Sequence, residues 1–442
     1  MNAVPSPLRR VVITGLGFIT PIGNDRDTVT ANLRNGRHGL EPIVFLDNPS
    51  LPVKVAGTVK DFAVDSTSWR DWTWPAHYEI PRETLRGLAP HGVYALCAVI
   101  QALRDAGLSE EAVAGDDATG LFCASAGSAM MLHHNLAQLH AVRGERGNPM
   151  GVVSSIAGTL NFNLAAHFRI TGAVCGFVSA CASASHALGY ACDEVQLGRL
   201  DRVIVVGAEE LNAETLLPFA AMRALSNSGD PVLASRPFDD GRDGFVGAGG
   251  SVVLILEEAG LAAARGARAQ AELVGWGQAA DGHSMAVSHP EGAGLRLAMQ
   301  RALAQSGVQP EEIDYVNAHG TSTPVGDRAE ALALRSVFTD VGARPRISST
   351  KALTGHPLSL AGAMEAAFCV LALTERFMPG NPHLVNPDPA CDGLDLPRSA
   401  VSLAPRIVLN NSSGFGGSNV CHVLRATESP RVSRRQPAPP RE

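Results

Sequence analysis

Residues 182–206 read ASASHALGYACDEVQLGRLDRVIVV and contain the two elements that decide the fold, a helix followed by a strand. In residues 182–197 apolar side chains recur at spacings of four, three and four, the pattern of an amphipathic helix. They are Ala184, Leu188, Ala191 and Val195. Gly198 follows as a residue that commonly ends helices. The β-branched run at 203–206 then predicts a short buried strand.

The same alternation extends along the chain in both directions. Apolar runs predict further strands at 11–14, 252–256 and 407–409. Stretches rich in Ala and Leu predict helices at 94–106, 294–305, 328–338 and 362–373. Strands that are apolar throughout are covered on both faces, so we expect an α/β fold built in layers.

A short sequence pattern that occurs twice favours a duplicated fold. The run VVITGLG (11–17) opens the chain, and AELVGWG (271–277) repeats its pattern just past the middle. We interpret each run as a strand that ends in a glycine turn. Glycine after a strand is common, so the repeated pattern alone is slender support.

The composition narrows the class of protein. The 442 residues are 45% apolar and 18% charged, which indicates a soluble protein with a sizeable core. A net charge of −7 argues against a nucleic-acid-binding protein. The eight cysteines include no CxxC pair, so we expect free thiols in a reducing compartment, with no metal site.

Two apolar stretches are not expected to enter a membrane. Residues 361–373 are too short to span a bilayer and include Glu365. Near the start, Arg9 and Arg10 precede VVITGLGFITPIG, which looks like a signal peptide but contains three glycines and a proline. We therefore expect a buried first strand and a cytoplasmic protein.

Cys181 is a candidate nucleophile because it lies at the predicted start of the 182–197 helix. Unpaired N–H groups and the positive end of the helix dipole favour the reactive thiolate there and can hold an oxyanion. The alternative is a buried core thiol, the usual fate of a free cysteine, and this segment alone leaves both open. Cys175 and Cys192 are assigned to the core.

Two further segments carry candidate histidines at the ends of strands, where sites are commonly built. Residues 317–327 (NAHGTSTPVGD) place His319 in a loop with Thr321 and Thr323, whose hydroxyls could bind an amide-bearing arm. Residues 347–365 (ISSTKALTGHPLSLAGAME) place His356 near Lys351 and end at Glu365. A lysine in such an apolar segment is costly unless paired, and Glu365 is its candidate partner. The alternatives are an incidental loop histidine, a solvated lysine and a surface histidine.

Residues 410–419 read NNSSGFGGSN and join two predicted strands. Three glycines in four positions permit close backbone approach and positive φ, and Phe415 among them could act as a gate. Glycine hairpins are common, so this loop is weak support by itself.

Together these segments resemble the β-ketoacyl-acyl-carrier-protein synthases. The resemblance rests on the small-residue turn around Cys181, on HGTSTPVGD, on the KxxxGH loop and on GFGGSN, which occur in the family's order. SRPFDDGRDGFVGAGG (235–250) is also similar to a family signature. The resemblance covers about residues 9 to 425, and the stretch that begins at Ser179 is most similar to the synthase I type.

The resemblance implies a thiolase fold, a duplicated five-layer αβαβα arrangement. We place one half, with the nucleophile, at residues 1–260 and the other, with both histidines, at 261–426. Residues 427–442 are proline-rich and expected to be disordered. The family is normally a homodimer that works with an acyl carrier protein; a heterodimer with a synthase-like partner is an alternative. No cofactor beyond the carrier's phosphopantetheine and no metal is implied.

The resemblance also implies a reaction, the decarboxylative Claisen condensation of an acyl group with malonyl-carrier thioester. Cys181 would carry the acyl group, with the N–H groups of Cys181 and Phe415 as oxyanion hole. His319 and His356 would hold the malonyl thioester oxygen. The remaining roles are organisation of the histidines by Lys351 with Glu365, and substrate contact by Thr321, Thr323 and Gly416. Arg86, Arg143 and Arg146 fall near family positions at the entrance, where they are either carrier-docking residues or ordinary solvated surface arginines.

The sequence departs from the family pattern at two positions within these motifs, and the tryptophan-rich stretch 67–90 also differs from the usual pattern. Ser413 replaces an aromatic residue before GFGG, and Ser359 replaces a glycine after His356. These changes affect expectations for the acyl pocket and the pathway, which is fatty-acid, polyketide or aryl-polyene biosynthesis. Two other functions are alternatives, a non-catalytic chain-length-factor partner and a thiolase acting on coenzyme A esters.

Overall fold

The computed structural model describes residues 8–43 and 53–427. The first half contains these main elements: β1 (Val11–Ile19), α3 (Pro90–Asp105), β4 (Thr119–Ala124), α5 (Thr159–Phe168), β5 (Val174–Phe177), α6 (Ser183–Gln196), β6 (Arg202–Glu209) and β7 (Gly250–Glu258). The second half contains β8 (Ala271–Ala280), α10 (Ala293–Ser306), β9 (Tyr315–Asn317), α11 (Pro324–Val337), β10 (Arg346–Ser348), α13 (Ala361–Glu375), β11 (Ile407–Gly414) and β12 (Ser418–Ala426). Each predicted helix and strand is present, with ends that differ by a few residues.

Shorter helices, strands and turns lie around these main elements. They are α1 (Arg26–Asn35), β2 (Leu40–Pro42), β3 (Val55–Gly57), α2 (Arg82–Leu85), α4 (Ala129–Ala141), α7 (Ala213–Ala221), α8 (Pro231–Ala234), α9 (Ala259–Ala264), α12 (Lys351–Thr354) and the 3₁₀ turns η4 (Leu358–Leu360) and η6 (Phe415–Gly417).

The main strands form a ten-stranded sheet in the order β5-β4-β6-β7-β1-β8-β12-β11-β9-β10. The first set is β5-β4-β6-β7-β1 and the second, also counted from its outer edge inward, is β10-β9-β11-β12-β8. The strands of the two sets have the same directions relative to their neighbours. In the first set β4 is parallel to β5 and β6, and β7 is antiparallel to β6 and β1. In the second set β9 is parallel to β10 and β11, and β12 is antiparallel to β11 and β8. The two segments that echo each other in sequence are therefore equivalent strands, β1 and β8.

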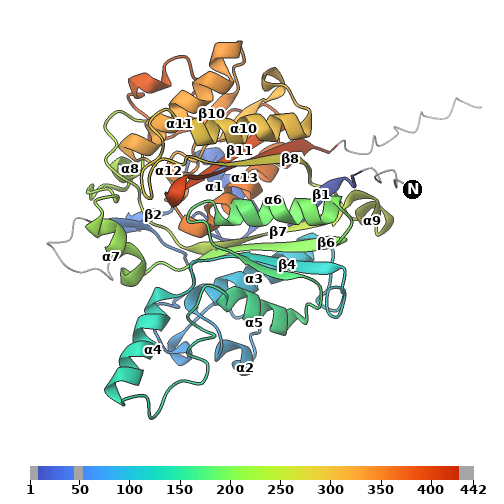
Figure 1. Cartoon of the computed structure of the whole chain (residues 1–442), viewed down its shortest axis with the longest axis vertical. Helices are drawn as coiled ribbons and strands as arrows, with labels where there is room; N and C mark the ends of the chain where they lie inside the picture. The colour runs from blue at the N-terminus through green and yellow to red at the C-terminus, as the bar shows by residue number, and fades with distance from the viewer. Residues whose placement is uncertain (1–7, 44–52, 428–442) are drawn as a thin grey trace, which may run out of the picture.

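Helices and strands alternate in five layers (Figure 1). α3 and α5 cover the outer face of the first set, and α10, with α11 beside it, covers the outer face of the second. α6 and α13 lie between the two sets, and the sets pair with each other through Val12–Glu272 and Ile13–Ala271 of β1 and β8. The expected duplicated αβαβα fold is confirmed.

The glycines of the two similar segments, 11–17 and 271–277, have a different structural role from the one expected. They do not form turns after the strands but lie inside β1 and β8. A Cβ on Gly15 would overlap the Ala102 carbonyl of α3, and a Cβ on Gly277 would overlap the Ala298 carbonyl of α10. Glycine at these positions lets a helix pack directly on the strand backbone, which the sequence pattern could not distinguish from a turn.

The two boundaries expected from the sequence, after residues 260 and 426, both lie within the part of the chain that the structure describes. The expected boundary between residues 260 and 261 falls within α9, between β7 and β8. Thr427, the first residue of the expected disordered tail, is described, and its hydroxyl donates a hydrogen bond to the Ala269 carbonyl at 2.7 Å. Residues 428–442 lie outside the described residues.

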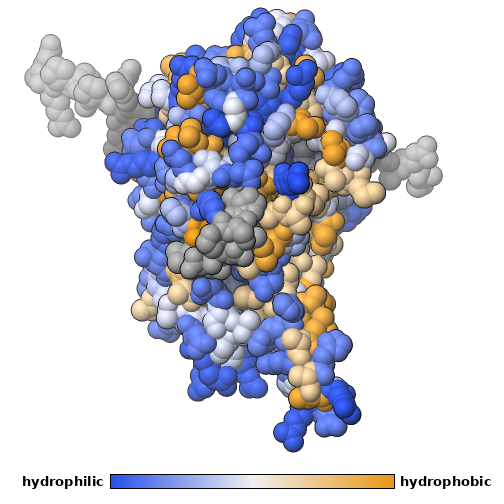
Figure 2. Space-filling model, turned by 90° about the vertical axis from the view of Figure 1, so that its left-hand side faces the viewer, coloured by the Kyte–Doolittle hydropathy of each residue, from blue (hydrophilic) through white to orange (hydrophobic). Residues whose placement is uncertain are grey.

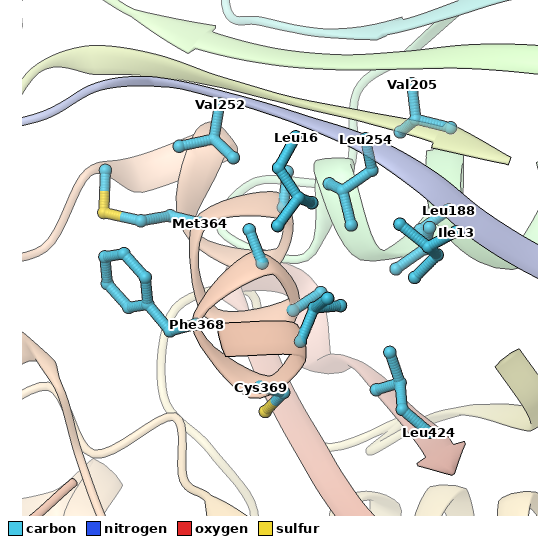
Figure 3. Packing of buried hydrophobic residues seen from close by; sticks show 14 of the residues in the cluster. Ile13, Leu16, Leu188, Val205, Val252, Leu254, Met364, Phe368, Cys369 and Leu424 are labelled. Atoms are coloured by element: carbon cyan, nitrogen blue, oxygen red, sulfur yellow. The ribbon is translucent and has the colours of Figure 1, made fainter. Parts of the chain in front are cut away.

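α13 is the central helix of the core. Met364 of this helix lies beside Val252 of β7 (Figure 3), and the ring of Phe368 stacks on that of Phe18 in β1 at 6.4 Å between centroids. Residues 358–375 are long and apolar enough to span a membrane by length and composition, but 89% of that window is buried inside the protein. The helix is therefore apolar on all sides because strands and helices surround it.

Candidate active site

Cys181 lies in the turn between β5 and α6, two residues before the helix begins. Ala180 beside it has φ 51°, a left-handed conformation that costs on the order of 1–2 kcal/mol and persists only where neighbours fix it. The Ser183 hydroxyl accepts from Ser179 N at 2.8 Å and donates to Ala180 O at 2.6 Å. The expected helix-start position is confirmed, and this turn directs Cys181 into a cavity.

The cavity has a volume of about 340 Å³ and is lined by both halves of the chain. Cys181 lies on its wall together with both candidate histidines and with Thr321 and Thr323. The apolar part of the lining includes Phe219, Phe245, Leu358 and Phe415. Residues that are far apart in sequence thus meet around one thiol, as the motifs predicted.

The two histidines lie on the wall beside the thiol. His356 Nε2 is 3.0 Å from Cys181 Sγ. The rings of His319 and His356 are 5.3 Å apart between centroids and nearly perpendicular, at 89°. The His356 backbone is fixed by the segment before β7, because its N–H donates to Val246 O at 2.6 Å and its carbonyl accepts from Ala248 N at 3.1 Å.

Lys351 and Glu365 lie behind His319 and outside the cavity lining. They form the expected ion pair, and both side chains are almost fully buried. Lys351 Nζ also donates to the His319 carbonyl at 2.6 Å and lies 3.5 Å from His319 Nδ1. The lysine therefore orients His319 and does not reach the cavity itself.

Glu330 of α11 is a supporting residue that the sequence analysis missed. Its buried carboxylate accepts from the backbone N–H groups of His319 (2.9 Å) and Gly320 (2.6 Å). Asn411 of β11 donates to the same carboxylate at 3.2 Å. The only available signal was a glutamate eleven residues after His319 on the helix that follows, and helical spacing alone does not show that it folds back.

Burial dominates the protonation of the thiol and of both rings. It raises the pKa of Cys181 to about 12, although the charge of Lys351 opposes the rise. It also lowers the pKa of His319 and of His356 well below the usual value, with Lys351 acting in the same direction. These shifts favour a neutral thiol beside neutral imidazoles. The helix start is where the sequence predicted it, and burial opposes the ionisation of the thiol that this position favours.

Comparison with known proteins shows the family. Residues 8–262 match the family described as Beta-ketoacyl synthase, N-terminal domain, and residues 270–385 match its C-terminal domain. The chain belongs to the β-ketoacyl synthase family. It is 38% identical over 425 residues to the 3-oxoacyl-[acyl-carrier-protein] synthase 1 of Haemophilus influenzae, covering 95% of this chain and 99% of that protein.

Solved structures agree with this assignment. The ishigamide ketosynthase/chain length factor superposes with a TM-score of 0.84 and 32% identity, covering 95% of this synthase and 100% of that chain. A type II PKS acyl-carrier protein in complex with its ketosynthase, AntDE:AntF, gives a TM-score of 0.82 and 26% identity, covering 96% and 100%.

The expected substrate contacts divide into those that line the cavity of this synthase and those that do not. Thr321 and Thr323 line it, with their hydroxyl oxygens 3.0 Å apart. Gly416 has φ 80° but is not a lining residue, although its neighbours Phe415 and Gly417 are. The gate expected at Phe415 is placed at the cavity, where its ring lies 6.0 Å from that of Phe219.

The three arginines expected to dock a carrier do not line the cavity. Arg86 is exposed at the end of α2, and Arg143 and Arg146 are exposed after α4. Their docking role stays a prediction. Arg223, which sequence reasoning missed, does line the cavity, from the segment after α7. Nothing in the sequence around it distinguishes it from a surface arginine.

The two departures from the family pattern have different structural consequences. Ser413 lines the cavity, and its hydroxyl donates to Asn419 Oδ1 at 2.7 Å. Ser359 is buried outside the lining, where its hydroxyl donates to the Glu209 carboxylate. Only Ser413 therefore changes the wall that a substrate meets.

The Lys351–Glu365 pair gives a test of stability. Glu365→Ala should lower the free energy of unfolding by about 3–5 kcal/mol, because it leaves a buried lysine without its counter-charge. The double variant Lys351→Met/Glu365→Leu removes both charges and should recover most of that loss. Urea unfolding followed by tryptophan fluorescence measures both. Equal losses in the single and double variants would show that the pair is not what stabilises this region.

Proposed function

We propose that this protein condenses an acyl group held on Cys181 with a malonyl-carrier thioester, releasing CO₂ and forming a β-ketoacyl thioester. The observation that carries the proposal is the 3.0 Å approach of His356 Nε2 to Cys181 Sγ, on a cavity wall that also holds His319. A non-catalytic partner would not need the thiol, and a thiolase would pair it with a second cysteine, whereas Cys181 is the one cysteine among the described residues that line this cavity.

The first half of the reaction moves the acyl group from its carrier to Cys181. As the acyl carbonyl approaches, the thiol proton passes to His356, and the developing charges pair with each other. The carbonyl oxygen becomes an oxyanion between the N–H groups of Cys181 and Phe415. These two turns are close, since a Cβ on Gly414 would lie 3.1 Å from Cys181 N. The carrier thiol leaves with a proton.

The second half uses the two histidines on malonyl thioester. Loss of CO₂ leaves an electron pair on carbon that is shared with the thioester oxygen. Once Cys181 is acylated, His356 no longer faces a thiol proton and carries its own proton on Nε2. His319 and His356 then both donate hydrogen bonds to that oxygen, and Lys351 keeps His319 in place. The carbanion then attacks the acyl-Cys181 carbonyl, the new C–C bond forms and the C–S bond breaks, and the released Cys181 thiolate takes up one proton from solvent.

We propose that an acyl carrier protein presents both substrates through its phosphopantetheine arm, with no other cofactor. The arm would pass Thr321 and Thr323, whose hydroxyls suit its amides. A solved relative that binds its own carrier supports this partner. Arg223 at the cavity, and Arg86, Arg143 and Arg146 farther out, are candidates for contact with an acidic carrier. The cytoplasm is the compartment that suits the free thiols.

We propose a homodimer joined through β5. The equivalent outer strands of the two halves differ: β10 is mostly buried, whereas β5 is mostly exposed. Val174 and Val178, in and after β5, are 40% and 68% exposed, which is unusual for an unpaired apolar edge. Apolar side chains also gather on the lower arm of the molecule in Figure 2, where α4 exposes Leu132, Leu136 and Leu139. A second copy, or a similar synthase-like subunit, would cover these surfaces.

The function is tested by turnover with purified substrates. The protein is mixed with malonyl-carrier and a panel of acyl-carriers of different length and unsaturation, and mass spectrometry follows the β-ketoacyl-carrier product and CO₂. We expect product from at least one acyl-carrier, and the preferred chain separates fatty-acid from polyketide or aryl-polyene synthesis. No product with any donor, from protein that is dimeric by light scattering, would refute the proposal.

A further inference from the structure

His186 is a titratable residue close to the nucleophile that the mechanism above does not use. It lies in α6, and its Nδ1 is 2.7 Å from the hydroxyl of Ser179, two residues before Cys181. On its other side Nε2 is 3.0 Å from Gln278 Oε1. One half-buried ring thus joins the nucleophile turn of the first half to β8 of the second half.

The directions of these hydrogen bonds form one consistent chain. Burial lowers the pKa of His186, so the ring is neutral at neutral pH. Gln278 Nε2 donates to the Tyr190 hydroxyl at 3.1 Å, which leaves Gln278 Oε1 facing the imidazole as an acceptor. The ring therefore donates from Nε2–H to Gln278 and accepts the Ser179 hydroxyl at Nδ1.

At one end of this hydrogen-bond chain, Ser179 belongs to a strained turn that the bond to His186 stabilises. Ala180 has a left-handed conformation, and the contacts through Ser183 hold it only to the first turn of α6. The contact through His186 holds it to the opposite half of the protein. Strained backbone persists when such contacts over-determine it.

The Gln278 end leads to the other turn of the site. Gln278 pairs with Val420 of β12, one residue beyond Asn419. Asn419 accepts from the Ser413 hydroxyl, and Ser413 and Asn419 flank the turn that holds Phe415. The hydrogen bonds through His186 thus lead to β11 and β12, the strand pair that carries the glycine turn opposite Cys181.

We propose that His186 is a positioning residue that keeps the Cys181 turn in register with the Phe415 turn, so that their two N–H groups act together on one oxyanion. The inference rests on the proposed function. It assigns to His186 an effect on acyl transfer and none on decarboxylation, which depends on His319 and His356 in the second half.

The test compares two half-reactions in His186→Ala. Acylation of Cys181 by an acyl-carrier should slow by about 10- to 100-fold, since a misplacement of about 1 Å at a reacting centre can cost on the order of 10² in rate. Release of CO₂ from malonyl-carrier should stay within about twofold of the parent, a change too small to indicate a lost transition-state contact. His186→Asn, whose amide oxygen can accept the Ser179 hydroxyl, should regain part of the acylation rate.

His167→Ala is the matched control. His167 is also half-buried, and its Nδ1 is also bonded to a hydroxyl, that of Thr84 at 3.2 Å, but it lies on α5 away from the cavity. It should change neither half-reaction. In addition, Gln278→Ala combined with His186→Ala should be no slower than His186→Ala alone, because both act through one chain.

Two results would overturn the inference: an unchanged acylation rate in His186→Ala, or an equal fall in both half-reactions. If the parent protein is not acylated at all, the proposed function fails, and alkylation of Cys181 by iodoacetamide then tests His186 separately. His186→Ala should slow this alkylation by about tenfold, because the thiol loses its alignment with His356. An unchanged alkylation rate at Cys181 would refute the positioning role in that case.

Discussion

Cys181→Ala should abolish formation of β-ketoacyl product while malonyl-carrier is still decarboxylated. Without the thiol there is no covalent acyl intermediate, and the rate of condensation should fall by at least about 10⁴-fold. His319 and His356 remain on the cavity wall and can still hold the malonyl thioester oxygen. Product and CO₂ are measured in the same reaction by mass spectrometry and by trapping of labelled CO₂.

Cys175→Ser is the control for this variant. The assignment of Cys175 to the core was wrong: it lies on the outer strand β5, six residues before Cys181, where it is exposed and does not line the cavity. It should keep both activities. If Cys181→Ala still condensed substrates, the covalent mechanism would be wrong, whatever the behaviour of the control.

His319→Ala should lose decarboxylation by about 10²–10³-fold, the usual cost of removing one donor from a developing oxyanion. Acylation of Cys181 should change much less, because His356 is the imidazole next to the thiol, at 3.0 Å. His283→Ala, which removes an exposed ring outside the cavity lining, should leave both steps unchanged. Full decarboxylation by His319→Ala would mean that His356 alone holds the enolate, and the role assigned to His319 would be wrong.

The sequence predicted the layers of the fold well because they depend on local patterns. The spacing of Leu188 and Val195 fixed the buried side of α6, and the run at 203–206 fixed β6. The duplication was visible only as a short echo, since what the halves share is strand order and direction. The glycines of β1 and β8 were misinterpreted as turns because the approach of α3 and α10 is a tertiary contact.

The site was predictable where its chemistry lies in short motifs. Cys181, His319 and His356 were named from their segments, and the structure brings all three to one cavity. Residues that act through tertiary contacts with a distant segment could not be found from short motifs. Glu330 reaches the His319 backbone from the next helix, and His186 reaches Gln278 from 92 residues away.

The protonation of Cys181 shows a further limit of sequence reasoning. A helix start predicts an easily ionised thiol, and that position is where the structure places Cys181. Whether the thiol ionises depends also on how much water reaches it. Burial raises its pKa, so Cys181 should react slowly with alkylating agents near neutral pH, and its acylation should depend on His356 as base.

The central claim is that Cys181 carries the acyl group, and site-resolved mass spectrometry of the protein after incubation with acyl-carriers alone tests it most directly. The account predicts a mass increase equal to the acyl group on Cys181, which disappears in Cys181→Ala and is discharged when malonyl-carrier is added. An unmodified Cys181 with every acyl donor, or an acyl group found on a different residue, would contradict it.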